Sequence, residues 1–151
     1  MKLRYIIAGI FISICFMVGF INLNIVNDDN ELKMNIVKAV KQTDEDILDF
    51  SKVTDFEWDK LYVFTPYSDP SQRLREDGVR CFNNSFSIEF NDTITMIAFV
   101  NDNKLVKYVN INYHYFNFED TTNFVLDKDE AKFNIIKSDG QYYLNHTDVI
   151  E

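Results

Sequence analysis

The amino-acid sequence predicts a small α+β domain that follows an apolar N-terminal helix. Three observations predict this fold class: a long uncharged run near the N-terminus, short helical patterns in the first half of the chain, and extended alternating runs in the second half. Helices and strands that are segregated along the chain favour an antiparallel sheet over an alternating α/β architecture. We therefore expect a transmembrane helix and then an antiparallel β-sheet packed with one or two short helices.

The apolar run covers residues 5–26 and contains no charged residue. A membrane-spanning helix needs roughly 17 to 25 apolar residues, so this run is long enough. Lys2 and Arg4 precede it, and basic residues are biased toward the cytoplasm. The sequence thus predicts four segments: residues 1–4 cytoplasmic, residues 5–26 a transmembrane signal anchor, residues 27–46 a juxtamembrane helix or stalk, and residues 47–151 an extracytoplasmic α+β domain.

A secretory signal peptide is the alternative interpretation of this run, because it shares the basic start and the apolar middle. Its cleavage site needs small residues, and the stretch "MVGFINLN" offers only Gly19. A lipoprotein signal needs a small residue before the modified cysteine, whereas Ile14 precedes Cys15. We favour a single-pass anchor in the cell membrane, with secretion after signal cleavage as the alternative.

A short amphipathic helix is expected directly after the anchor, in "NDDNELKMNIVKAVKQ". Asn30 is a suitable N-cap for it. The next segment, "TDEDILDFSK", is ambiguous, because Thr43 with Asp46 suits a capping box whereas the apolar residues from Ile47 suit a strand. We favour a strand from Ile47. The apolar residues of the expected helix recur at helical spacing: Leu32, Ile36, Val37 and Val40.

The stretch "FEWDKLYVFTPY", residues 56–67, predicts a strand that ends before Pro66. Phe56 and Trp58 alternate with acids, and the next apolar run, "LYVF", has no polar break. This change of pattern predicts a strand that begins at a solvated rim and continues into a region covered on both faces. Pro66 ends the strand because proline cannot donate to the sheet ladder.

A short helix follows in "SDPSQRLREDG". Ser68 or Asp69 can cap its N-terminus, Pro70 suits its first turn, and Gly78 is placed to close it.

The second half of the chain predicts a β-meander. "TITMIAFV" and "KLVKYVNINYHYFNF" are extended runs joined by the turn sequence "NDNK", and "AKFNIIK" and "QYYLNH" form a last hairpin around Asp139 and Gly140. Alternate residues of the long second run form two faces. The face expected to point to the core contains Leu105, Lys107, Val109, Ile111, Tyr113 and Tyr115; the other contains Val106, Tyr108, Asn110, Asn112, His114, Phe116 and Phe118.

The predicted domain is acidic. The chain carries a net charge of -9, and because Lys2 and Arg4 precede every acid, the part from Asp28 onward carries -11. Like charge opposes binding to nucleic acid or to anionic polymers, so we expect no nucleic-acid partner. The expected partners are the membrane, through the N-terminal helix, and a cationic peptide or protein.

The sequence contains no motif for a metal, a cofactor or a catalytic triad. His114, His146 and Cys81 are too far apart in sequence to resemble a zinc site. "DKDEAKFN" lacks the glycine and the last glutamate of a calcium loop, and Gly78 and Gly140 are too few for a phosphate-binding loop. We expect no cofactor, no metal and no catalytic residue, and we interpret Cys81 as a small buried apolar residue.

Paired carboxylates are the best argument for an enzyme. Glu57 and Asp59 flank Trp58 on one face of the predicted strand, and like charges in close quarters shift each other's pKa. A cell-envelope hydrolase or cation-dependent enzyme that uses these acids with His114 is therefore the alternative function. We favour a membrane-tethered extracytoplasmic binding or interaction module, in which Trp58 packs in the core.

Trp58, Asp59 and Lys60, followed by Pro66 and Tyr67, resemble a recurrent pattern in small, uncharacterised extracytoplasmic proteins of low-GC Gram-positive bacteria, many of which carry a signal anchor or a lipid anchor. The resemblance covers about residues 47–80. It implies an extracytoplasmic location and a related fold, and it implies no catalysis. The residues of this stretch that we single out for binding are Glu57, Trp58, Asp59, Lys60 and Tyr67.

Overall fold

The computed structural model describes residues 2–42, 46–83 and 85–146, with the side chains of these residues except at 2–4, 8 and 20–24. The described chain is α+β and its sheets are mainly antiparallel, which confirms the predicted class. Thr43 of the predicted capping box lies outside the described residues.

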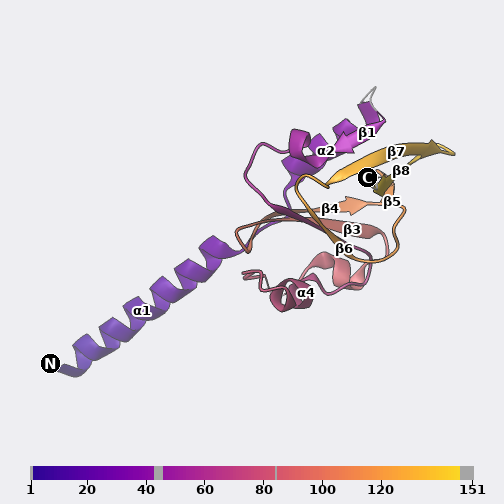
Figure 1. The fold of residues 1–151 in the computed structure, drawn as a ribbon. Helices are drawn as coiled ribbons and strands as arrows, with labels where there is room; N and C mark the ends of the chain where they lie inside the picture. The colour runs from indigo at the N-terminus through magenta and orange to yellow at the C-terminus, as the bar shows by residue number, and fades with distance from the viewer. Residues whose placement is uncertain (1, 43–45, 84, 147–151) are drawn as a thin grey trace.

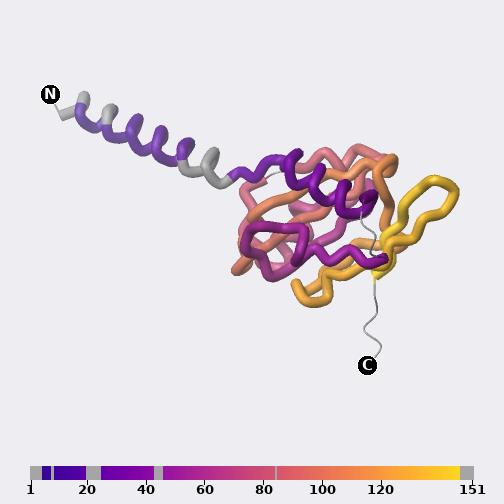
Figure 2. The backbone as a smooth tube through the Cα atoms, turned by 90° about the horizontal axis from the view of Figure 1, so that it is seen from above, coloured from indigo at the N-terminus to yellow at the C-terminus, as the bar shows by residue number. Residues whose placement is uncertain are grey.

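Helix α1 (Lys2–Asn24) projects away from the rest of the chain (Figures 1 and 2). Ten of its described side chains are large, apolar and more than half exposed, from Val18 at 52% to Phe16 at 78%. Among the described residues, no helix is both long and apolar enough to cross a membrane. Residue 8 and residues 20–24 of the predicted span lie outside the described side chains.

Two four-stranded sheets form the domain, where the sequence predicted one meander (Figure 1). All neighbouring strands of the first sheet are antiparallel. In the second sheet, β5 is parallel to β8 and the other pairs are antiparallel. The strands of the first sheet, in spatial order, are β4 (Lys104–Asn112), β3 (Ile94–Asn101), β2 (Lys60–Phe64) and β6 (Phe124–Asp127). Those of the second are β1 (Ile47–Asp49), β7 (Lys132–Ser138), β8 (Gln141–His146) and β5 (Asn117–Phe118).

Helix α2 (Asn30–Gln42) packs against the first sheet and is part of the folded domain. Its four predicted apolar residues are all buried, with Ile36 fully so. The predicted N-cap was wrong by one residue, because Asp29 accepts the hydrogen bond from the Leu32 N–H at 2.9 Å and Asn30 is already helical. Residues 30–42 of the predicted juxtamembrane helix or stalk thus form a helix that packs on the domain.

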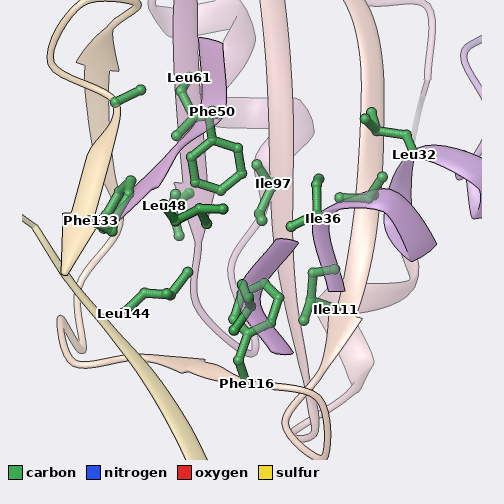
Figure 3. Packing of buried hydrophobic residues seen from close by; sticks show 14 of the residues in the cluster. Leu32, Ile36, Leu48, Phe50, Leu61, Ile97, Ile111, Phe116, Phe133 and Leu144 are labelled. Atoms are coloured by element: carbon green, nitrogen blue, oxygen red, sulfur yellow. The ribbon is translucent and has the colours of Figure 1, made fainter. Parts of the chain in front are cut away.

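Both faces of β2 are covered, as its unbroken apolar run predicted. Leu61 and Val63 lie in a main core cluster that also contains Ile36 of α2 and Phe133 and Leu144 of the second sheet (Figure 3). On the opposite face, a second cluster joins the first sheet to helix α4 (Pro70–Glu76) and the short 3-10 helix η1 (Ser87–Phe90). It contains Tyr62, Phe64, Leu74, Ile88, Met96 and Ala98.

The predicted start of β2 was wrong. The strand begins at Lys60 instead of Phe56, and residues 56–59 are irregular. They follow a short helix, α3 (Phe50–Val53), which the sequence pattern did not indicate.

Two details of the predicted second half differ from the structure. The run of residues 104–118 is interrupted after Asn112, so β4 and β5 belong to different sheets. The register of β4 against β3 shifts between Phe99 and Val100, because Phe99 pairs with Lys107 and Val100 pairs with Leu105. An extra residue in one strand reverses the alternation of side chains. Leu105 therefore packs in the second cluster, whereas Val109 packs in the main one.

Candidate functional site

The predicted site residue Trp58 is part of the core. Its side chain is 2% exposed and packs edge-on against Phe99, with ring centroids 5.3 Å apart. The indole Nε1–H donates to Thr54 Oγ1 at 2.7 Å, which satisfies its only polar group. The expectation that this tryptophan packs in the core is confirmed.

The predicted acidic pair does not share a strand face. Glu57 is exposed and lies in the irregular segment before β2. The Asp59 Oδ2 accepts a hydrogen bond from the Asp102 N–H at 3.0 Å, so this carboxylate holds the tight turn between β3 and β4. Asp59 is thus bound to the backbone of a turn, and Lys60 beside it is exposed.

His114 lies at the other end of the β3–β4 hairpin. Asp59 contacts the turn that joins the two strands, whereas His114 follows Asn112, which pairs with Ile94 at the start of β3. Strand β3 between these ends has eight residues. Its seven steps of roughly 3.3 Å each give a separation of about 23 Å. Asp59 and His114 therefore cannot act on one substrate atom.

Tyr67 joins the end of β2 to η1 through its backbone. Its N–H donates to the Ile88 carbonyl at 3.1 Å, and its φ of 63° lies in the left-handed region. The ring is 66% exposed. The five predicted binding residues thus include one core residue, one turn-capping acid and three exposed side chains that the structure does not gather into a cleft.

Cys81 is half-buried and packs against the second cluster. Burial raises the pKa of the Cys81 thiol, so the nucleophilic thiolate is disfavoured at neutral pH. Within the described ranges, no group of three or more His, Cys, Asp or Glu side chains is placed to hold a metal ion.

The structure instead gathers polar groups where the segment between α1 and α2 crosses the outer edge of β4. Asp28 forms a parallel bridge with Tyr108, and the Asp29 N–H donates to the Tyr108 carbonyl at 3.0 Å. The Asn110 N–H donates to Asp28 Oδ1 at 3.1 Å. This segment therefore covers part of an edge strand that would otherwise expose unpaired backbone groups.

Two ion pairs strengthen this contact. Lys33 Nζ lies 3.0 Å from Asp28 Oδ2, and Lys107 Nζ lies 2.7 Å from Asp29 Oδ2. The backbone hydrogen bond from Leu32, and then the bond from Lys107, lower the pKa of Asp29 below its ordinary value. Asp29 is thus ionised at neutral pH, and both acids are partnered within the fold.

A cleft of about 340 Å³ opens beside this contact, between the start of α2, the end of β4 and η1. We name it the Asp28–Asn110 cleft. Small-molecule sites usually occupy roughly 300 to 1,000 Å³, so its size suits a small ligand. Its polar lining consists of Asp28, Asn30, Lys33, Ser87, Asn110 and Asn112. Its other lining residues are Met34, Ile94 and Tyr115.

Asn110 has an unusual position in this cleft. The residue is 9% exposed, and its Oδ1 is a buried acceptor with no hydrogen-bond partner among the described residues. Its Nδ2 donates to Asp28 Oδ2 at 3.3 Å. Native proteins leave few buried polar atoms unpaired. This acceptor is closed to solvent, so the cleft is a candidate binding site by its volume and its polar lining.

On the other side of the same segment, Asn83 fixes the chain just after α1. The Val26 N–H donates to Asn83 Oδ1 at 3.1 Å, and Asn83 Nδ2 donates to the Val26 carbonyl at 2.7 Å. The side-chain amide thus forms the two hydrogen bonds that a paired strand would form.

Comparison of the chain with protein-family models, with curated proteins and with solved structures finds no match. The candidate site therefore depends on geometry alone. Sequence reasoning missed it because Asp28 and Asn110 are separated by 82 positions in the chain. The available signal was the pair Asn110 and Asn112, two amides at alternate positions on a strand rich in apolar residues.

Proposed function

We propose that this protein is a membrane-tethered binding module on the outer face of a bacterial cytoplasmic membrane. The observation that supports this proposal most strongly is the surface of α1. Its exposed apolar side chains, among them Ile10, Phe11, Ile12 and Ile14, occupy every side of the helix. A helix that is apolar all round is stable only inside a protein core or in lipid, and α1 projects away from its own domain (Figure 2).

The orientation in the membrane follows from charge. Lys2 and Arg4 lie before the apolar run, and the acidic remainder lies after it. The preference of basic residues for the cytoplasm supports an N-terminus inside the cell and the domain outside. The resemblance of about residues 47–80 to extracytoplasmic proteins supports the same location.

The domain is held close to its anchor. Helix α1 ends at Asn24, and the Asn83 side chain already binds the backbone of Val26. Asp28 and Asp29 are then paired with β4. With so short a connection, the Asp28–Asn110 cleft lies near the membrane surface in this arrangement.

Binding is a better account of the domain than catalysis. The acids of the alternative hydrolase do not meet His114, whereas the Asp28–Asn110 cleft offers a volume with a polar lining. The net charge of the segment beyond the anchor disfavours anionic polymers. The same net charge favours a cationic peptide or protein as a further partner for the outer surface.

The proposed topology is tested by adding protease to intact protoplasts that express the full chain. We expect the domain to be degraded while a cytoplasmic control protein is preserved. A domain that is degraded only after lysis contradicts the proposed location.

A further inference from the structure

The open end of the β3–β4 hairpin lies in a part of the domain that is acidic and has no basic residue. Three segments form this part: residues 65–69 after β2, residues 85–95 around η1 and the start of β3, and residues 110–124 between the end of β4 and the start of β6. They contain no Lys and no Arg, and we name them together the acidic end. A surface whose charges have one sign attracts partners of the opposite sign. The acids of these segments are Asp69, Glu89, Asp92, Glu119 and Asp120.

Hydrogen bonds join the three segments of the acidic end. The Thr65 N–H donates to Asn123 Oδ1 at 2.8 Å, which links the first segment to the third. The Tyr113 N–H donates to the Thr93 carbonyl at 3.0 Å, which links the third segment to the second. The acidic end is therefore one continuous part of the folded domain.

A pocket of about 200 Å³ opens at the acidic end. Asp92 and Asp120 line it from two different segments, and both residues are exposed. Neither carboxylate has a hydrogen-bond or ion-pair partner among the described residues. The described lining of the pocket also includes no Lys, Arg or His side chain. A cation that entered the pocket would therefore meet two carboxylates that the fold does not already neutralise.

Aromatic rings line the same pocket. Tyr113 and Phe118 both contribute to it. The Tyr113 side chain is 42% exposed, although the His114 ring packs against it with centroids 4.0 Å apart. Carboxylates beside aromatic rings suit the guanidinium group of arginine, which forms parallel hydrogen bonds to carboxylates and also stacks on rings. The rings offer no oxygen ligand to a calcium or magnesium ion.

Two further aromatic residues adjoin the pocket lining in the chain. Phe90, at 86%, and Tyr67, at 66%, have the most exposed large apolar side chains of the described residues after α1. Phe90 lies two positions before Asp92, and Tyr67 directly follows Pro66, which also lines the pocket. Exposed apolar residues that gather at a pocket mark an interaction site. The pocket is smaller than the roughly 300 to 1,000 Å³ of small-molecule sites, so it suits one side chain of a larger partner.

We propose that the acidic end binds a basic segment of another protein and takes an arginine side chain of that segment into its pocket. The proposal deepens the proposed function, because it gives the favoured cationic partner a surface and a residue type. Ile25, directly after α1, lines a pocket with Lys104 beside the turn of the β3–β4 hairpin. The acidic end lies at the opposite end of this hairpin, so a membrane around α1 leaves it accessible.

The test uses the full chain in nanodiscs of phosphatidylcholine, a lipid without net charge, at physiological ionic strength. The probe is a capped, fluorescent peptide that alternates arginine with leucine. A second peptide has citrulline in place of arginine, which keeps the shape and removes the charge, and a third has lysine. Fluorescence anisotropy measures binding, and empty nanodiscs are the blank. We expect a dissociation constant of about 0.1 mM or tighter for the arginine peptide, with binding about threefold weaker for lysine and about tenfold weaker for citrulline.

Charge variants locate the binding. Asp92→Asn combined with Asp120→Asn should weaken binding of the arginine peptide about fivefold, because two exposed ion pairs are lost. Asp55→Asn combined with Asp139→Asn is the matched control. It removes the same charge from exposed positions outside the acidic end, so binding should change less than about twofold.

Ring variants test the aromatic surface separately. We expect Tyr113→Ala and Phe90→Ala each to weaken binding about threefold. Both side chains are exposed, so neither replacement removes a core contact, and circular dichroism checks that each variant is folded.

Five outcomes overturn the proposal: no binding of the arginine peptide, equal binding of the citrulline or the lysine peptide, equal effects of the two double variants, binding that both ring variants leave unchanged, or displacement of the peptide by spermidine at equal concentration. The last result would identify a free polyamine as the ligand. None of these outcomes bears on the protease test of topology. A domain found inside the cell would contradict the proposed function and leave peptide binding by the purified protein intact.

Discussion

Trp58 shows how one residue can be distinctive in sequence and structural in role. It is the only tryptophan of the chain, it is buried against Phe99, and its N–H is satisfied by Thr54. Its acidic neighbours Glu57 and Asp59 are exposed. Trp58 is thus distinctive in the sequence because it is the single tryptophan, but its buried position gives it a structural role and no catalytic or binding role.

Replacing Trp58 with alanine should destabilise the domain strongly. Truncation of a buried tryptophan typically costs about 3 to 5 kcal/mol, through lost burial and the cavity that remains. We expect Trp58→Ala to lower the free energy of unfolding by this amount in urea denaturation. Glu57→Ala, at an exposed neighbouring position, should stay within about 0.5 kcal/mol of the original chain. Equal urea midpoints for the two variants would show that Trp58 does not anchor the core.

Asp29 links stability to acidic pH. Its hydrogen bond from Leu32 and its pair with Lys107 lower its pKa in the folded state. Its contribution is therefore present above the ordinary pKa of an aspartate, near 4, and is lost as the pH falls through the lower folded value. Asparagine caps a helix as well as aspartate, so Asp29→Asn removes the ion pair with Lys107 and keeps the cap. We expect it to weaken the fold at pH 7 by about 0.2 to 1 kcal/mol and to reduce the loss of stability on acidification.

Urea unfolding at about pH 7 and pH 3 measures both effects of the Asp29 substitution. Asp55→Asn is the control, because Asp55 is exposed and outside any helix cap. If Asp29→Asn and the unsubstituted chain lose stability in parallel on acidification, the linkage assigned to Asp29 is wrong.

Tyr62 should cause part of the loss of stability of the domain at strongly alkaline pH. Burial, and then the nearby carboxylate of Asp77, raise the pKa of Tyr62 to about 12. A phenol whose folded pKa is raised contributes stability that is complete below its unfolded pKa, about 10, and is lost as the pH rises toward about 12. We expect Tyr62→Phe to reduce the alkaline loss of stability, measured by urea unfolding at stepped pH. An identical alkaline profile for this variant would contradict the assignment.

At the scale of elements, the sequence was sufficient to predict the turns and helix caps that are formed by residues close together in the chain. Asp69 accepts from the Gln72 N–H and Pro70 begins α4, as the sequence predicted. The hairpin of β7 and β8 closes on Asp139 and Gly140, which both have positive φ. These features depend on residues within a few positions of each other, which is why sequence alone revealed them.

Elements that depend on distant partners were not predicted. Strand β6 is only four residues long and is defined by its pairing with β2, so its own pattern is weak. The side of the sheet on which Leu105 packs depends on a register shift against β3. The irregular segment before β2 also escaped prediction, because its alternation of rings and acids is equally typical of a strand.

The β7–β8 turn is open to a direct test. Gly140 has a φ of 78°, where a residue with a side chain is strained, and an added Cβ would meet no atom within 4 Å. We therefore expect Gly140→Ala to destabilise the domain by about 1 kcal/mol through the backbone alone. Gly140→Asn should cost less, because asparagine enters the left-handed region more readily. Thermal unfolding of both variants measures the difference, and equal melting temperatures would show that this turn tolerates either residue.

At the scale of the whole molecule, the candidate site exists only through tertiary structure. Asp28 lies just after α1, Lys33 lies in α2 and Asn110 lies near the end of β4, and the chain brings them together by crossing the edge of a sheet. Sequence patterns predicted the fold class, which the structure confirms, and the anchor stays a prediction. They did not predict the cleft. The crossing of the edge of β4 by the segment around Asp28 and the packing of the two sheets both depend on residues far apart in the chain.

Extraction of cell membranes with alkaline carbonate shows whether α1 holds the domain at a membrane. We expect the full chain to stay in the membrane pellet. A variant with Ile10→Glu and Ile14→Glu should move to the supernatant, because each charge placed in the middle of an inserted helix costs roughly 2.5 to 3.5 kcal/mol. Recovery of the full, unsubstituted chain in the soluble fraction, without detergent, would show that α1 does not anchor the domain in a membrane.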